Sequence, residues 1–157
     1  MSLAAVSRAE KEQRFLKQSA VTLLALGVLF AADVFHQLLL GWKENGWIIG
    51  VFVTLTLGTV ALLFWNVVAS LRYSGQAFFW SGQFSDEWLA HLNLTGYRWC
   101  SGVVLSLLFI SVYASGMESV NAWLSMQGIA FYGKSLLAIG LICYAVPVLW
   151  GLRSNDE

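Results

Sequence analysis

Charged side chains are scarce in this chain, and long stretches hold none at all. Asp, Glu, Lys and Arg make up 11% of its 157 residues, whereas a soluble globular protein carries roughly 25%. Apolar residues make up 58%, and the mean hydropathy is +0.67. This shortage of charge excludes an ordinary soluble domain and indicates an integral membrane protein, organised as one domain over residues 1–157.

Residues with recognisable chemistry are scarce too. The two cysteines, Cys100 and Cys143, lie on separate apolar runs without a nearby His or Cys, which predicts packed thiols, with a disulfide as the lesser alternative, and no metal site. The sequence contains no nucleophile elbow, P-loop, H-E-x-x-H or C-x-x-C motif. It also has no basic patch with interleaved aromatic residues. We therefore expect no cofactor and no nucleic-acid partner.

Four apolar runs are long enough to cross a bilayer, whose hydrocarbon core requires about 20 apolar residues in a helix. The clearest run covers residues 47–71 and contains no charged residue. The others cover about residues 20–40, 99–119 and 128–152. The sequence therefore predicts an all-α integral membrane protein, folded as a bundle of four transmembrane helices.

One connection between these spans is long, and it covers residues 72–98. Within it, residues 85–87 are typical of a helix start, with an N-cap followed by two acids in the first turn. The apolar residues that follow fall on one side of the helix, which predicts an amphipathic segment lying in the membrane interface. Residues 8–19 predict a short helix, either on the membrane surface or leading directly into the first span. Residues 120–127 predict a loop.

Lysine and arginine are distributed unevenly between the two sides of the spans. Four precede the first span, Arg72 and Arg98 lie in the long connection, and Arg153 follows the last span, while the other side holds only Lys43. The positive-inside rule then places both termini and residues 72–98 in the cytoplasm. Tryptophans near both ends of the spans agree with two interfacial belts. We expect a bacterial inner (plasma) membrane.

Small or polar residues recur at a spacing of four along the second span, with Leu62 as the exception between Gly46 and Ser70. A ridge of this kind lets another helix backbone approach closely in lipid. The sequence leaves open whether that helix belongs to the same chain or to a partner. The small-residue ridge consists of Gly46, Gly50, Thr54, Gly58, Asn66 and Ser70.

A second group of polar residues shares one depth in the membrane, when depth is counted at about 1.5 Å per residue. Its members come from the first, third and fourth spans and lie in the outer third of the bilayer. A bare charge in the bilayer is costly, so such residues usually face other helices and pair. They either set the helix register or form a proton, ion or ligand site. This polar cluster consists of Asp33, His36, Gln37, Tyr113, Glu118 and Lys134.

These patterns favour a non-enzymatic membrane subunit of a homo-oligomer or of a larger membrane complex. The alternative is a small channel, transporter or membrane sensor that uses the polar cluster, and a weaker alternative is a membrane enzyme acting on lipid. Expected partners are membrane lipid, other membrane subunits and a cytoplasmic protein docked on the long connection. The expected docking residues are Arg72, Phe78, Phe79, Trp80, Phe84, Trp88 and Arg98.

Overall fold

The structure is a computed structural model that describes residues 8–40, 46–74 and 84–154. All the regular structure in these residues is helical, which confirms the all-helical class. The helices are α1 (Arg8–Leu40), α2 (Gly46–Ser74), α4 (Glu87–Ala114) and α5 (Glu118–Ser154).

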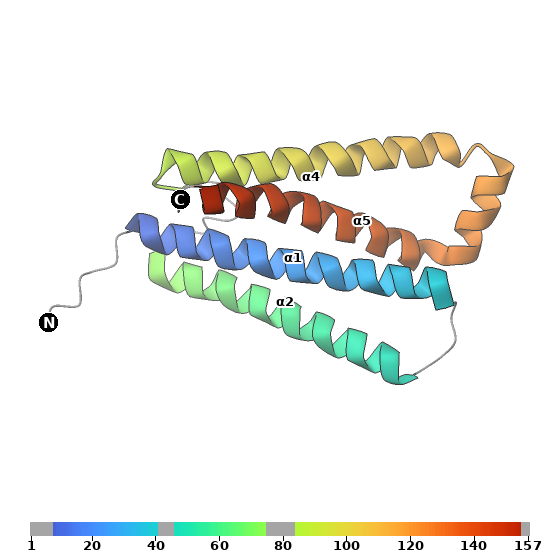
Figure 1. The fold of residues 1–157 in the computed structure, drawn as a ribbon, viewed down its shortest axis with the longest axis horizontal. Coiled ribbons are helices and arrows are strands. Elements are labelled where there is room, and N and C mark those ends of the chain that lie inside the picture. Colours follow the sequence, from blue (N-terminus) through green and yellow to red (C-terminus); the bar gives the residue numbers. More distant parts are fainter. Residues whose placement is uncertain (1–7, 41–45, 75–83, 155–157) are drawn as a thin grey trace, which may run out of the picture.

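The four helices lie side by side in the order α4, α5, α1, α2, with neighbouring helices antiparallel (Figure 1). α5 and α1 occupy the middle of the row, and α5 packs against both α4 and α1. The described residues of α2 pack mainly against α1. The bundle is therefore an open row, with α2 and α4 as its two edge helices.

Among the residues that the structure describes, three helices are long and apolar enough to span a membrane. The qualifying segments are Ala9–Leu38, Glu87–Ala114 and Glu118–Ser154. The described residues of α2 include a shorter apolar segment, Val53–Leu62. Membrane association of this chain thus agrees with its fold as well as with its composition.

Within the residues that the structure describes, no separate surface helix precedes α1. α1 is continuous from Arg8 to Leu40, so of the two expectations for residues 8–19 the direct continuation into the first span is correct. Its first three turns carry four of the chain's nine Lys and Arg residues, and its remaining turns are mostly apolar.

The amphipathic segment expected before the third span does not lie apart from that span. α4 begins at Glu87 because Asp86 caps it, accepting a hydrogen bond from the backbone N–H of Trp88 at 2.8 Å. From there the helix runs unbroken to Ala114. Leu89 and Leu92, on the apolar side of this segment, are buried against other helices. The apolar side at the start of α4 therefore packs on protein, and residues 75–83 of the expected interfacial segment lie outside the described residues.

The loop expected at residues 120–127 is also helical. A short turn follows α4, and α5 begins at Glu118 and continues until Gly128, where φ is +78° and ψ is 164°. A left-handed φ of this kind favours glycine, and here it redirects the chain. The ring of Trp123 then meets that of Phe131 edge-on, with centroids 6.0 Å apart. The expected start of the fourth span near residue 128 therefore coincides with this kink.

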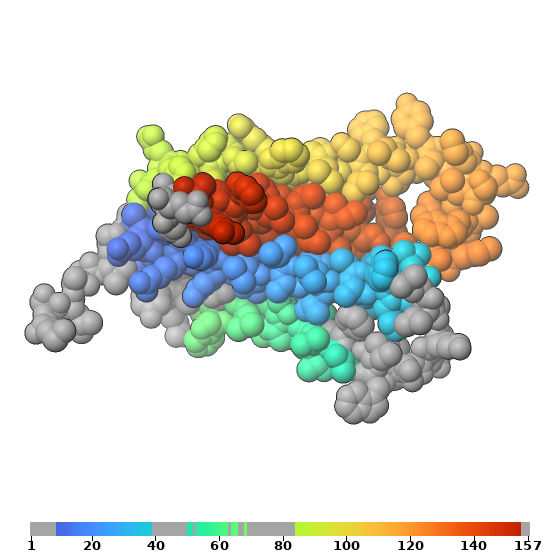
Figure 2. Space-filling model, in the orientation of Figure 1, coloured from blue at the N-terminus to red at the C-terminus, as the bar shows by residue number. Residues whose placement is uncertain are grey.

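The main apolar core lies at one end of the row, which we call the core end. It is made by the first turns of α1 and α4 and the last turns of α5, and the atoms of these three helices are in close contact there (Figure 2). Towards the other end, a gap separates α4 from the beginning of α5 (Figure 2). The core consists of Leu16, Ala20, Leu89, Leu92, Tyr144, Ala145, Val148 and Leu152.

Glycines allow α1, α4 and α5 to approach one another closely. A Cβ added at Gly27 of α1 would lie 2.9 Å from Ile142, and one at Gly96 of α4 would lie 2.8 Å from both Tyr144 and Val148. A Cβ at Gly140 of α5 would lie 3.1 Å from Val104. Small residues at helix contacts are characteristic of packing in membranes. The glycines used within this chain thus lie outside the predicted ridge on α2.

Candidate polar site on helices α1 and α5

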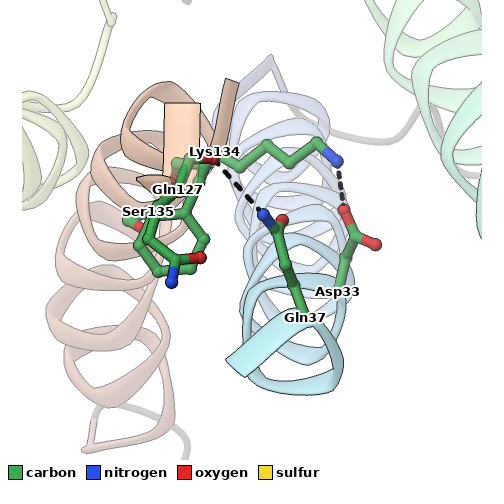
Figure 3. Close-up of polar contacts among 6 residues, drawn as sticks. Asp33, Gln37, Gln127, Lys134 and Ser135 are labelled. Atoms are coloured by element: carbon green, nitrogen blue, oxygen red, sulfur yellow. Dashed lines mark hydrogen bonds and ion pairs between the residues drawn. The ribbon is translucent and has the colours of Figure 1, made fainter. Parts of the chain in front are cut away.

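Asp33 of α1 and Lys134 of α5 form an ion pair. The lysine Nζ donates a hydrogen bond to Asp33 Oδ2 at 2.5 Å (Figure 3). The side chain of Lys134 is 34% exposed and that of Asp33 is 27% exposed. The antiparallel packing of α1 on α5 brings these positions to the same level. Two charges that would each be costly in lipid therefore neutralise one another.

A second polar contact lies one turn further along α1. Gln37 follows Asp33 by four residues and shares its face of the helix, and its Nε2 donates to the backbone carbonyl of Gln127 at 3.5 Å (Figure 3). That carbonyl belongs to the last residue before the kink at Gly128. Carbonyls at a helix end lack their intrahelical partners. The kink therefore exposes an acceptor that Gln37 reaches.

The other three members of the predicted polar cluster are placed differently. His36 is partly buried on α1, three residues from Asp33. Tyr113 is 80% exposed on the edge helix α4, and Glu118 is exposed at the start of α5. Neither Tyr113 nor Glu118 forms a hydrogen bond or ion pair with Asp33 or Lys134. The structure thus brings together Asp33 and Lys134, with Gln37 beside them.

The chemistry open to this arrangement is electrostatic. A carboxylate and an ammonium in contact can exchange a proton, or separate to admit an ion, since each is about one-third exposed or less and reaches the molecular surface. Among the described residues, no group of three or more His, Cys, Asp or Glu side chains is placed to hold a metal ion. The thiols of Cys100 and Cys143 are free and half-buried.

The small-residue ridge of α2 faces away from the rest of the chain wherever the structure describes it. A Cβ added at Gly50 or Gly58 would meet nothing within 4 Å. Thr54 between them is exposed, and its hydroxyl donates to the carbonyl of Gly50 at 2.8 Å. Gly46 is the first residue of α2, and the side chains of Asn66 and Ser70 lie outside the described residues. Gly50 and Gly58 are therefore not used to pack α2 within the chain.

The predicted docking residues fall into three groups. The side chain of Arg72 and the whole of Phe78, Phe79 and Trp80 lie outside the described residues. Phe84 and Trp88 are partly buried and pack against the core, which leaves little of either ring for a partner. Arg98 is exposed on α4. Among the described docking residues, Arg98 is thus the one whose side chain is fully accessible.

Two buried polar contacts at the core end were not predicted. Glu12 of α1 is 0% exposed, and its Oε2 accepts hydrogen bonds from the backbone N–H of Ser85 at 2.7 Å and from the Ser85 hydroxyl at 2.8 Å. This joins α1 to the residues just before α4. Glu12 lies among basic residues in the sequence. The charged residues around it are typical of a solvent-exposed helix, so the sequence does not indicate that Glu12 is buried.

The second contact joins α4 to α5. The Tyr144 hydroxyl donates to Oδ1 of Asn93 at 2.6 Å, and Asn93 is 2% exposed. The Tyr97 ring lies beside that of Tyr144, with centroids 5.2 Å apart. Asn93 also opens an Asn-Leu-Thr sequence, but its buried amide is not accessible to carry a glycan.

Comparisons place this site and its fold in no known group. Neither a family model, nor a curated protein, nor a solved structure matches this chain.

Proposed function

We propose that this chain is a non-enzymatic, four-span subunit of a membrane oligomer or of a larger membrane complex. In this proposal α2 crosses the bilayer together with α1, α4 and α5, and the core end faces the cytoplasm of a bacterial inner membrane. The basic residues at the start of α1, which lie at the core end, support this orientation through the positive-inside rule.

The observation that carries the proposal is the exposed ridge of an edge helix. α2 packs mainly against α1, and its Gly50, Thr54 and Gly58 are open to the surroundings. In lipid, apolar side chains alone give no drive for association, whereas a ridge of small residues allows backbones to come into contact. Such a ridge on the outside of the chain suits the α2 helix of a second copy or a helix of another subunit.

Leucine substitutions in the ridge test this proposal. Gly50→Leu and Gly58→Leu should reduce the mass of the complex extracted in mild detergent, because each adds a bulky side chain where a partner backbone would lie. The mass and composition would be measured by light scattering and native mass spectrometry. Gly102→Leu is the matched control, since Gly102 on α4 also has nothing within 4 Å of an added Cβ.

The proposal requires that the ridge variants keep the helix content and melting temperature of the wild type while the complex becomes smaller. An unchanged mass in both ridge variants would contradict it, as would a wild-type chain that is extracted as a monomer without any co-purifying subunit. Labelling of Lys43→Cys from outside the cell, and of Asp156→Cys only after permeabilisation, is the expected result for the orientation. The reverse pattern would overturn the orientation alone.

A second candidate function is a proton or ion pathway, and the Asp33–Lys134 pair is the observation that favours it. Asp33→Asn and Lys134→Met should then abolish ion or proton flux into liposomes containing the purified protein, with the complex intact. Glu118→Gln, which changes an exposed acid outside the pair, is the control. If both pair variants only lower the amount of folded protein, the pair has a structural role.

A further inference from the structure

We infer that α4 carries a binding site for one anionic phospholipid, with the phosphate at Arg98 and an acyl chain in a groove that begins beside it. The inference rests on the membrane insertion proposed above but not on oligomerisation. The lipid would belong to the leaflet at the core end.

The groove is open to the surroundings, follows one face of α4 and has a volume of about 530 Å³, which falls within the roughly 300–1,000 Å³ of ordinary ligand sites. The floor of the groove includes Gly102, which has no side chain to fill it, and a Cβ added there would meet nothing within 4 Å. The Trp99 ring, 60% exposed, stands on its border. The lining is otherwise mostly apolar and consists of Arg98, Trp99, Gly102, Val103, Ser106 and Leu107.

The polar atoms of the groove leave one charge unmatched. The Ser106 hydroxyl donates to the carbonyl of Gly102 at 2.8 Å, so it is already satisfied by its own helix. Arg98 is exposed, and the described residues supply its guanidinium with neither a hydrogen bond nor an ion pair. Asp33 and Lys134, in contrast, neutralise each other. Arg98 therefore requires an anion from outside the chain, or water at the surface.

A phosphate group meets this requirement well, because the planar guanidinium donates two parallel hydrogen bonds to phosphate oxygens. Basic residues at the inner ends of transmembrane helices attract anionic lipids in the same way. Arg98 is thus the headgroup end of the site and the apolar groove is its chain end.

The direction of the groove agrees with the direction of a lipid. Ser106 lies two turns after Arg98, about 12 Å further along the helix and away from the core end. With the core end at the cytoplasmic surface, Arg98 lies near the headgroups and the groove leads towards the bilayer centre. Trp99 also borders a second apolar groove of about 510 Å³, which Pro147 and Trp150 of α5 line on the other side. The second acyl chain of the same lipid fits there.

Native mass spectrometry of the purified protein with matched lipids tests the site. The protein would be equilibrated with phosphatidylglycerol or phosphatidylcholine of identical acyl chains, and the bound lipid counted. The wild type should retain phosphatidylglycerol in preference. Arg98→Gln should lower that preference about fivefold, the factor that one basic residue near the surface contributes. Gly102→Leu should lower retention of both lipids, because its side chain fills the groove.

Two controls isolate the site. Arg14→Gln removes an exposed cation from α1, and Ser101→Leu adds bulk to an exposed position of α4 outside the groove, so both should behave as the wild type. Equal preference in wild type and Arg98→Gln would overturn the inference, as would an equal loss in Arg14→Gln or undiminished retention in Gly102→Leu. A monomeric wild type that retains the lipid would contradict the proposed oligomer and leave the lipid site standing.

Discussion

The two ends of the helix row are held together differently. At the core end, Leu16 and Val148 are completely buried, and Glu12 is buried with its carboxylate bonded to Ser85. At the opposite end, which we call the ion-pair end, Met126 is 82% exposed and Ile129 is 91% exposed. The ion-pair end relies on the Asp33–Lys134 pair and the contact between Gln37 and Gln127.

This difference follows from the solvent that each end is expected to meet. In the proposed orientation, the charged first turns of α1 and the start of α4 put the core end at or beyond the membrane surface, where water drives apolar side chains together. Within the bilayer, lipid is as apolar as leucine and supplies no such drive. The ion-pair end is then free to expose its apolar side chains to lipid, and polar contacts determine how the helices meet.

The largest expected effect breaks the core end. Gly96→Leu should destabilise the fold by about 3 kcal/mol, as overpacking of a tight contact does, because an added Cβ would lie 2.8 Å from Tyr144 and Val148. Gly102→Leu on the same helix is the control and should leave the free energy of unfolding nearly unchanged. The measurement is a denaturation series in mixed micelles. Equal midpoints for the two variants would show that α4 and α5 are not in close contact at Gly96.

A smaller effect is expected when the buried carboxylate is removed. Glu12→Ala should destabilise the protein by about 2 kcal/mol, because it leaves the backbone N–H of Ser85 without its charged acceptor. Amide exchange over residues 85–89 should become faster, which would report the loosened start of α4 directly. Glu118→Ala, an exposed acid in the first turn of α5, should have the weaker effect of a helix-dipole contact. Unchanged exchange at the start of α4 in Glu12→Ala would contradict the proposed clamp between α1 and α4.

The smallest effect is expected at the ion-pair end, where the coupling between Asp33 and Lys134 can be measured and compared with the contacts at the core end. A double-mutant cycle with Asp33→Asn and Lys134→Met should give a coupling free energy of about 0.6 kcal/mol, the typical value for polar contacts between membrane helices. Both side chains are partly exposed, which argues against the larger values of fully buried pairs. Strictly additive losses would mean that the two charges do not interact in the folded protein.

Parts of the fold were predictable because their signals are local. Long apolar runs predicted helices at α1, α2, α4 and α5, and the acids near residue 86 predicted a helix start, although Asp86 and not Ser85 is the N-cap. The apolar side at the start of α4 was expected to face the membrane interface, whereas its Leu89 and Leu92 are buried against other helices. Periodicity does not distinguish these two surroundings.

The candidate site was predictable in part for a related reason. Depth along the helix brings Asp33 and Lys134 to similar levels, and the structure pairs them. The same count placed Tyr113 with them, but α4 is an edge helix and its Tyr113 is 80% exposed. Depth is a function of residue number alone, whereas the neighbour of each helix depends on the order of the row.

By itself, the sequence determined the helical class and the apolar character of the spans, because hydropathy and helix length are properties of short stretches of chain. Only the tertiary structure decided the order α4, α5, α1, α2, the burial of Glu12 and the exposure of Gly50 and Gly58. The physical reason is that a glycine or a carboxylate has the same local signal in either surrounding. Which residues contact that glycine or carboxylate depends on how helices distant in the sequence pack against one another.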